Sequence, residues 1–123
     1  MLKKLFHTYN SILLILYLYP GSILGFLLYK DFYKQPQLTS DFLSISISSN
    51  HFYAFLLLAF LGFWTFKYNK FFLIYLLSVS IILELSHLII PNRTFQFSDL
   101  FGNMLGVLVA IFVLILFSLG KKL

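Results

Sequence analysis

Two side chains that can exchange protons lie three positions apart inside an apolar stretch of this sequence. Glu84 and His87 have the spacing that places both on one face of a helix. Glu84 lies six residues before Ile90, roughly 9 Å along a helix axis from the end of the apolar stretch. A charge at that depth in a membrane helix costs at least about 2.5–3.5 kcal/mol, so Glu84 is a candidate functional residue.

More polar residues follow at helix-like spacing. Arg93 comes just after Pro91, and Asp99 and Asn103 are four positions apart. His51 opens an earlier apolar segment, so antiparallel packing of these segments would bring their polar ends together. We predict a ligand-binding site formed by His51, Glu84, His87, Arg93, Asp99 and Asn103.

The charges of this set limit what it can bind. Glu84 and Asp99 contribute −2 and Arg93 contributes +1, so the set carries −1 when the histidines are neutral. Such a site favours an ammonium group, an amino sugar or a hydroxyl-rich sugar headgroup. Arg93 can also hold a phosphate through its planar, bidentate guanidinium if the two acids are neutralised.

Three other interpretations use the same residues. In a catalytic one, Glu84 or His87 acts as a base and Arg93 as an electrostatic stabiliser, although no serine or cysteine lies in a recognisable nucleophile motif. In a structural one, Glu84 pairs with Arg93, and Asp99 caps a helix. In the third, Glu84 and His87 join His51 and Asp99 as metal ligands. Because nothing duplicates the Glu-x-x-His motif, we expect no metal and no cofactor.

The composition of the chain indicates a membrane protein. Of 123 residues, 60% are hydrophobic and 11% charged, whereas soluble domains average about 25% charged residues. This excludes a nucleic-acid-binding module and nearly all soluble enzymes, and the absence of cysteine excludes disulfides and thiolate chemistry. The bilayer is therefore the first expected partner.

Four segments approach the length of a membrane-spanning helix, which needs about 20 residues. They cover residues 11–29, 51–66, 71–90 and 100–119, and the longest connection is an outer loop over residues 30–50. We predict an all-α fold, a single transmembrane domain in which four helices form an antiparallel bundle.

Local signals refine this bundle. Pro20 and Gly21 predict a kink in the first helix, and Pro91 ends the third. Ser98 or Asp99 is expected to cap the fourth helix. Apolar and polar residues alternate over residues 43–48, which is typical of a short strand. Alternatively, the second helix begins before residue 51. Close helix packing is expected at Gly102 and Gly106, which are four positions apart.

The basic residues predict the orientation. Six would lie on the side of the termini and three on the opposite side, which favours cytoplasmic N- and C-termini. The first group is Lys3, Lys4, Lys67, Lys70, Lys121 and Lys122, and the second is Lys30, Lys34 and Arg93.

The polar pattern resembles the signature of the VanZ-like family of small membrane proteins. That signature has a Glu, a Gln three positions on, a Pro-x-Arg, an Asp, an Asn four positions later and a Gly three after it. A His that opens a helix, with an aromatic residue four positions on, precedes it. The residues that match are His51, Phe55, Glu84, Pro91, Arg93, Asp99, Asn103 and Gly106.

The resemblance covers residues 50–110 and has two departures. His87 replaces the family's usual Gln, and the Asp-Lys pair that usually precedes the helix-opening His is absent. The founding member is associated with lowered susceptibility to teicoplanin, a lipoglycopeptide antibiotic. The resemblance therefore implies a protein of the bacterial cytoplasmic membrane that binds a polar lipid headgroup or a glycopeptide antibiotic. The alternatives are an enzyme that acts on a lipid headgroup through Glu84 and His87, or an assembly partner of a larger complex.

Overall fold

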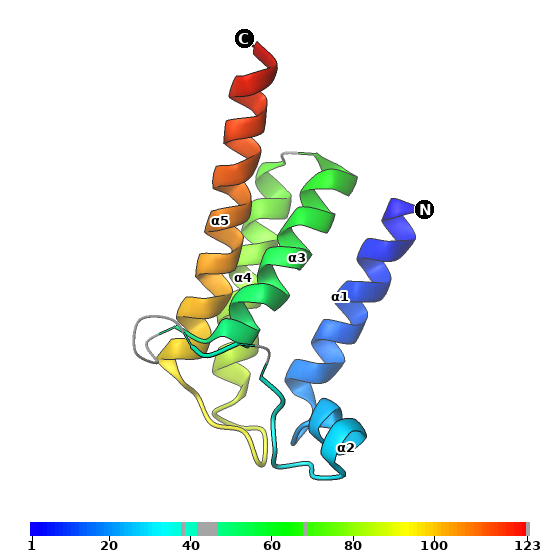
Figure 1. Ribbon diagram of the computed structural model, residues 1–123, viewed down its shortest axis with the longest axis vertical. Coiled ribbons are helices and arrows are strands. Elements are labelled where there is room, and N and C mark those ends of the chain that lie inside the picture. The colour runs from blue at the N-terminus through cyan, green and yellow to red at the C-terminus, as the bar shows by residue number, and fades with distance from the viewer. Residues whose placement is uncertain (38, 42–46, 68, 123) are drawn as a thin grey trace.

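The protein folds into helices that alternate in direction (Figure 1). The computed structural model describes residues 1–37, 39–41, 47–67 and 69–122, with side chains described through residue 117. The N-terminus, the α3–α4 turn and the C-terminus lie at one end, and the α4–α5 connection lies at the other (Figure 1). The helices are α1 (Leu2–Leu18), α2 (Ile23–Tyr29), α3 (Ser49–Phe66), α4 (Lys70–Ser86) and α5 (Phe97–Lys122).

The first predicted helix is two helices. The prediction of one helix over residues 11–29 is wrong, because α1 begins at Leu2 and α2 turns away from it by 87°. The break falls at the predicted Pro20–Gly21 kink, where Gly21 has a φ of 133° that other residues rarely adopt. Ser22 then caps α2 by accepting a hydrogen bond from the Gly25 backbone N–H. The described chain therefore has five helices rather than four.

The other predicted boundaries also shift. Helix α3 begins at Ser49, two residues before the predicted start, and residues 43–46 of the predicted strand lie outside the described part. Helix α4 ends at Ser86 rather than residue 90, because the chain before Pro91 tightens into turns such as Ile89 N–H to Ser86 O. Helix α5 begins at Phe97, which places Ser98 and Asp99 in its first turn, so neither is its N-cap.

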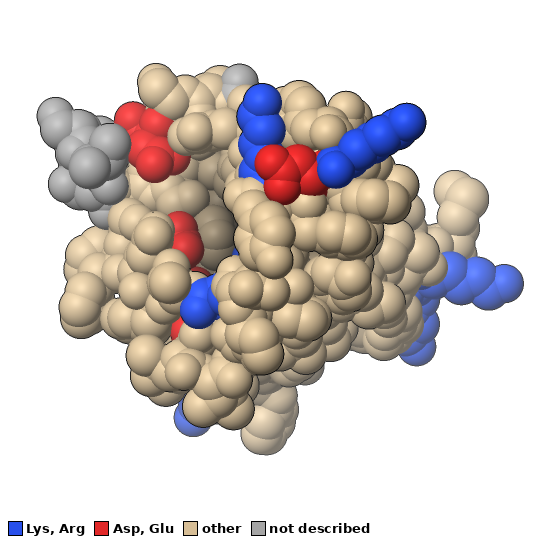
Figure 2. Space-filling model, turned by 90° about the horizontal axis from the view of Figure 1, so that it is seen from below, with Lys and Arg blue, Asp and Glu red and all other residues tan. Residues whose placement is uncertain are grey.

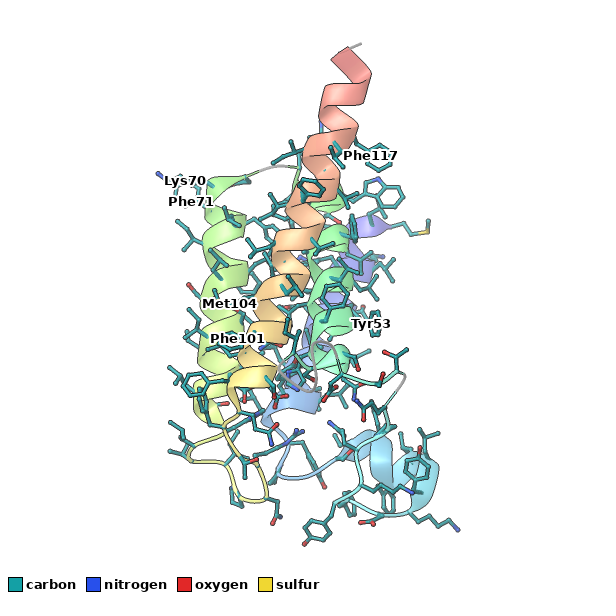
Figure 3. The ribbon with its side chains drawn as sticks, turned by 60° about the vertical axis from the view of Figure 1, so that its left-hand side comes forward. Tyr53, Lys70, Phe71, Phe101, Met104 and Phe117 are labelled. Carbon is teal, nitrogen blue, oxygen red and sulfur yellow. The ribbon has the colours of Figure 1, made fainter. Side chains whose placement is uncertain are left out.

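The lengths of the helices support two or three membrane crossings. Among the described residues, α3 and residues Phe97–Phe117 of α5 are long and apolar enough, and α1 with α2 would add a bent third. Helix α4 has 17 residues, which is slightly too short for it to be counted among these crossings. Large apolar side chains such as Phe71 and Phe117 are exposed (Figure 3), as expected for a lipid-facing surface. Four crossings remain a prediction.

Helices α3 and α5 make the most extensive helix contact in the molecule. A Cβ atom on Gly102 would lie 2.6 Å from the Ser48 carbonyl oxygen, and one on Gly106 would lie 2.6 Å from that of Phe52. Any side chain there would push the helices apart. This close approach brings the beginning of α5 against the beginning of α3.

Candidate functional site

The polar residues meet at the end of the bundle formed by the α2–α3 and α4–α5 connections. Helix α1 contributes Tyr17, α3 contributes His51, α4 contributes Glu84, and α5 contributes Asp99 and Asn103. The α4–α5 connection adds His87 and Arg93, so the structure brings all six predicted residues to one region.

His51 lies at the centre of this region. Its Nδ1 is 2.8 Å from the Tyr17 hydroxyl and 3.0 Å from Asn103 Oδ1, and its Nε2 is 3.5 Å from Asp99 Oδ1. Tyr17 also donates a hydrogen bond to Asn103 Oδ1 at 2.9 Å. The Asn103 amide nitrogen donates to the Ser80 carbonyl at 3.1 Å, which fixes the orientation of the amide. One network thus joins α1, α3, α4 and α5.

Glu84 is fully buried beside this network. Its Oε1 accepts a hydrogen bond from the Gln96 backbone N–H at 3.1 Å and lies 3.4 Å from His87 Nδ1. Its Oε2 is buried and has no hydrogen-bond partner among the described residues. His87 donates from Nε2 to the Tyr17 carbonyl at 2.9 Å, because a carbonyl can only accept. One carboxylate oxygen is therefore left without a partner.

Arg93 fastens the end of α1. Its Nε donates to the Tyr19 carbonyl at 3.0 Å, and a terminal nitrogen donates to that of Leu16 at 2.5 Å. These are carbonyls that the end of a helix leaves without intrahelical partners. No Glu84–Arg93 ion pair occurs between these described residues, so the structural interpretation built on that pair is wrong. Burial lowers the pKa of Arg93 from its very high ordinary value.

Two cavities open at this end. The first, of about 410 Å³, is mainly polar in its lining, which includes Asp41, His51, His87, Arg93 and Asp99. Figure 2 shows the face of the molecule at this end, with acidic and basic side chains around a hollow. Glu84 does not line this cavity, so it lies behind the wall that His51 and Asp99 form.

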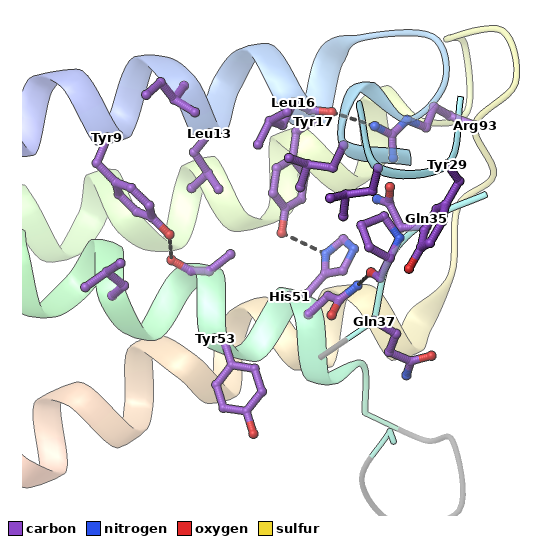
Figure 4. Close-up of a pocket in the computed structure, with 17 residues that line it drawn as sticks. Tyr9, Leu13, Leu16, Tyr17, Tyr29, Gln35, Gln37, His51, Tyr53 and Arg93 are labelled. Carbon is purple, nitrogen blue, oxygen red and sulfur yellow. Dashed lines mark hydrogen bonds between the residues drawn. The ribbon is translucent and has the colours of Figure 1, made fainter. Parts of the chain in front are cut away.

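The second cavity, of about 570 Å³, lies between α1, α2 and α3 (Figure 4). Its wall is mainly apolar and includes Ile12, Leu13, Leu28 and Leu57. It shares Gln35, Gln37, Asn50, His51 and Arg93 with the polar cavity. Figure 4 shows Arg93 and His51 at the polar end of this space. The two cavities therefore meet at a shared polar wall.

Sequence reasoning missed two residues of this region. Tyr17 lies in an apolar segment, where a tyrosine is more often a packing or interfacial residue. Asp41 accepts hydrogen bonds from the Ser49 backbone N–H at 3.1 Å and the Gln37 amide at 2.7 Å. Asp41 lies eight positions before Ser49, where α3 begins, so no local capping pattern in the sequence identifies it.

The fold and this region define a class: a helical membrane protein with a polar site at one end of the bundle. The chain belongs to the VanZ/LLP1 family, whose family model matches residues 5–118. No curated protein and no solved structure matches it.

Proposed function

We propose that this VanZ-like protein binds an amphiphile, a polar lipid headgroup or a glycopeptide-type antibiotic, and that it lowers susceptibility to teicoplanin. The protein would lie in the bacterial cytoplasmic membrane, with both termini in the cytoplasm and the polar cavity facing outward. Lys3 and Lys4 lie at the beginning of α1, and Lys67 and Lys70 flank the α3–α4 turn at the same end, which supports this orientation.

The junction of the two cavities is the observation that carries this proposal. A polar headgroup fits the cavity of about 410 Å³, and an acyl chain fits the apolar cavity of about 570 Å³. Both volumes fall in the usual range of roughly 300–1,000 Å³ for small-molecule sites. His51 and Arg93 line both cavities, so they would lie where the headgroup joins the chain. A lipoglycopeptide has both parts.

The charges around the polar cavity favour donors on the ligand. Asp41 and Asp99 line it and can accept hydrogen bonds from ammonium or hydroxyl groups. Arg93 would orient an anionic or carbonyl oxygen with the N–H groups that its two helix-end hydrogen bonds leave over. Of the two candidate bases in the catalytic interpretation, Glu84 lines neither of these cavities. His87 lines the polar cavity, but its ring nitrogens face the Tyr17 carbonyl and Glu84 Oε1, and this favours binding over catalysis.

A matched pair of substitutions on α1 tests the proposal. Ile12 lines the apolar cavity and is 50% exposed, whereas Ile15 is 59% exposed and does not line it. Ile12→Trp would fill the space meant for an acyl chain, and Ile15→Trp would add the same ring outside it. Expressed in a susceptible bacterium, wild type and Ile15→Trp should raise teicoplanin tolerance, and Ile12→Trp should not.

Membrane abundance of each variant is measured by immunoblot, so that a loss of protein is not mistaken for a loss of binding. The proposal is contradicted if Ile12→Trp, present at the wild-type level, protects as well as wild type. A glycopeptide without an acyl chain serves as the comparison, and tolerance to it should change less.

A further inference from the structure

His51, Glu84 and Asp99 come from three different helices and present their polar atoms to one small volume. One ring nitrogen of His51, one carboxylate oxygen of Glu84 and one of Asp99 all lie within 4.8 Å of one another. An imidazole with two carboxylates is a donor set that suits divalent transition-metal ions.

The hydrogen bonds of His51 fix which of its nitrogens carries a proton. Asn103 Oδ1 can only accept, because the amide nitrogen is turned to the Ser80 carbonyl. The 3.0 Å approach of His51 Nδ1 to this oxygen therefore places the proton on Nδ1. The neutral ring then has its lone pair on Nε2, facing Asp99 Oδ1 at 3.5 Å. A lone pair and a carboxylate repel each other unless a proton or a metal ion lies between them.

Glu84 points to the same conclusion independently. Its side chain is 0% exposed, and within the described part of the chain its Oε2 has no hydrogen-bond partner. A buried carboxylate oxygen without a partner carries a large desolvation cost. Its other oxygen is held by the Gln96 backbone N–H, so the orientation of the carboxylate is fixed in advance.

We propose that His51 Nε2, Glu84 and Asp99 bind a divalent transition-metal ion such as Zn²⁺. Zinc bonds of about 2.0–2.2 Å give tetrahedral ligand separations of roughly 3.3–3.5 Å. The His51–Asp99 pair is 3.5 Å apart. The Glu84 oxygen lies within 4.8 Å of the other two ligand atoms and would move toward them by at most about 1.5 Å. The proton on Nδ1 and its acceptor Asn103 form the outer hydrogen bond typical of a metal-binding histidine.

The ligand set differs from the one that the sequence spacing suggested. His87 is occupied on both sides, by the Tyr17 carbonyl and by Glu84 Oε1, so it supports Glu84 rather than binding the ion. His51 and Asp99 line the polar cavity, so an open fourth position would face that cavity. From the sequence, His51 and Asp99 are further candidate ligands beside Glu84 and His87, and no metal is expected because nothing duplicates the Glu-x-x-His motif.

The ion also changes the headgroup that the site accepts, and this consequence rests on the proposed function. Glu84, Asp99 and Arg93 together carry −1, and a divalent ion brings them to +1. A phosphate-bearing headgroup would then be attracted to the open position and to Arg93.

Zinc binding to the purified full-length protein in detergent tests the site without any amphiphile. Protein freed of its affinity tag and treated with EDTA should bind one equivalent of Zn²⁺ per chain by calorimetry, and neither Ca²⁺ nor Mg²⁺ should compete. Asp99→Asn should weaken Zn²⁺ binding by more than the 10- to 100-fold that loss of an outer hydrogen bond costs. His7→Gln, at an exposed histidine near the N-terminus, is the control and should bind as wild type does.

Cobalt absorption distinguishes a built site from loose surface binding. Co²⁺ should give visible absorption bands in wild type and in His7→Gln, and Asp99→Asn and Glu84→Gln should lose them while their thermal unfolding stays cooperative. Wild-type protein without these bands, or an Asp99→Asn protein that keeps them, overturns the ion site. For the headgroup, a short-chain phosphatidic acid should bind about tenfold more tightly to Zn²⁺-loaded than to EDTA-treated protein. Equal binding overturns that consequence.

Discussion

Near the N-terminus, aromatic rings fill the space between helices, whereas at the opposite end the same helices meet through polar side chains. Phe72 packs edge to face against Phe6 and Phe63, with ring centroids 5.5 and 5.1 Å away. At the polar end, Tyr17, His51 and Asn103 form a hydrogen-bonded triangle. The aromatic end lies at the end of the bundle where Lys3 and Lys4 begin α1 and Lys67 and Lys70 flank the α3–α4 turn, and the polar end carries both cavities.

The difference between the two ends separates stability from binding. Aromatic packing contributes directly to stability and needs no partner outside the chain. A buried carboxylate with an unpartnered oxygen contributes little to stability, and apolar replacements of such groups are often neutral or stabilising. We infer that the aromatic end holds the helices together and that the polar end is maintained for a ligand.

Phe72→Ala should have the largest effect on stability. Phe72 is 9% exposed and fills the space over Gly62, so its removal leaves a cavity and lowers the free energy of unfolding by about 3–5 kcal/mol. Denaturant unfolding in detergent measures this change. Zinc affinity, measured under conditions where the variant is folded, should remain within about twofold of wild type. A large loss of zinc affinity would show that the two ends are not separate.

Gly106→Val should lower both the stability of the protein and its affinity for zinc. A Cβ at Gly106 lies 2.6 Å from the Phe52 carbonyl oxygen and 2.7 Å from the Leu56 nitrogen, so α5 must move away from α3. Overpacking of this kind costs at least about 1–3 kcal/mol. Because Asp99 and His51 lie on these two helices, zinc affinity should fall as well. Leu108→Val, on an exposed part of α5, controls for the lower helix propensity of valine.

Glu84→Gln should change stability least and binding strongly. The substitution keeps the shape of the side chain and an acceptor for the Gln96 backbone N–H, and it removes a buried charge. The free energy of unfolding should stay within about 1 kcal/mol of the wild-type value, and zinc binding should be lost. If Glu84→Gln unfolds as easily as Phe72→Ala, the carboxylate is a structural group, and the inferred division between the ends is wrong.

The predictable part of the fold and site consists of periodic features. Helical spacing within one segment placed Glu84 near His87 and Asp99 near Asn103, and His51 stands two residues from the actual start of α3. The proline and glycine marked the break after α1, since proline lacks a backbone N–H and glycine alone adopts positive φ readily. These signals are local, so the sequence displays them.

The unpredicted part depends on how the helices are rotated against one another. Tyr17 contacts Asn103, 86 positions away, and no local pattern distinguishes it from the neighbouring aromatics. The partners of Arg93 are backbone carbonyls of α1, which carry no sequence signature. The 87° turn into α2, which helps to form the apolar cavity, is joined to the loop over residues 30–37 by a backbone hydrogen bond from Ser22 N–H to Phe32 O, and this contact has no sequence signature either.

Native mass spectrometry of the protein purified from bacterial membranes tests the central claim most directly. If the two joined cavities hold an amphiphile, the wild-type protein and Ile15→Trp should retain a lipid of defined mass, one per chain. Ile12→Trp should have lost it. Wild-type protein without any retained lipid, or the same lipid on Ile12→Trp as on Ile15→Trp, would contradict the account.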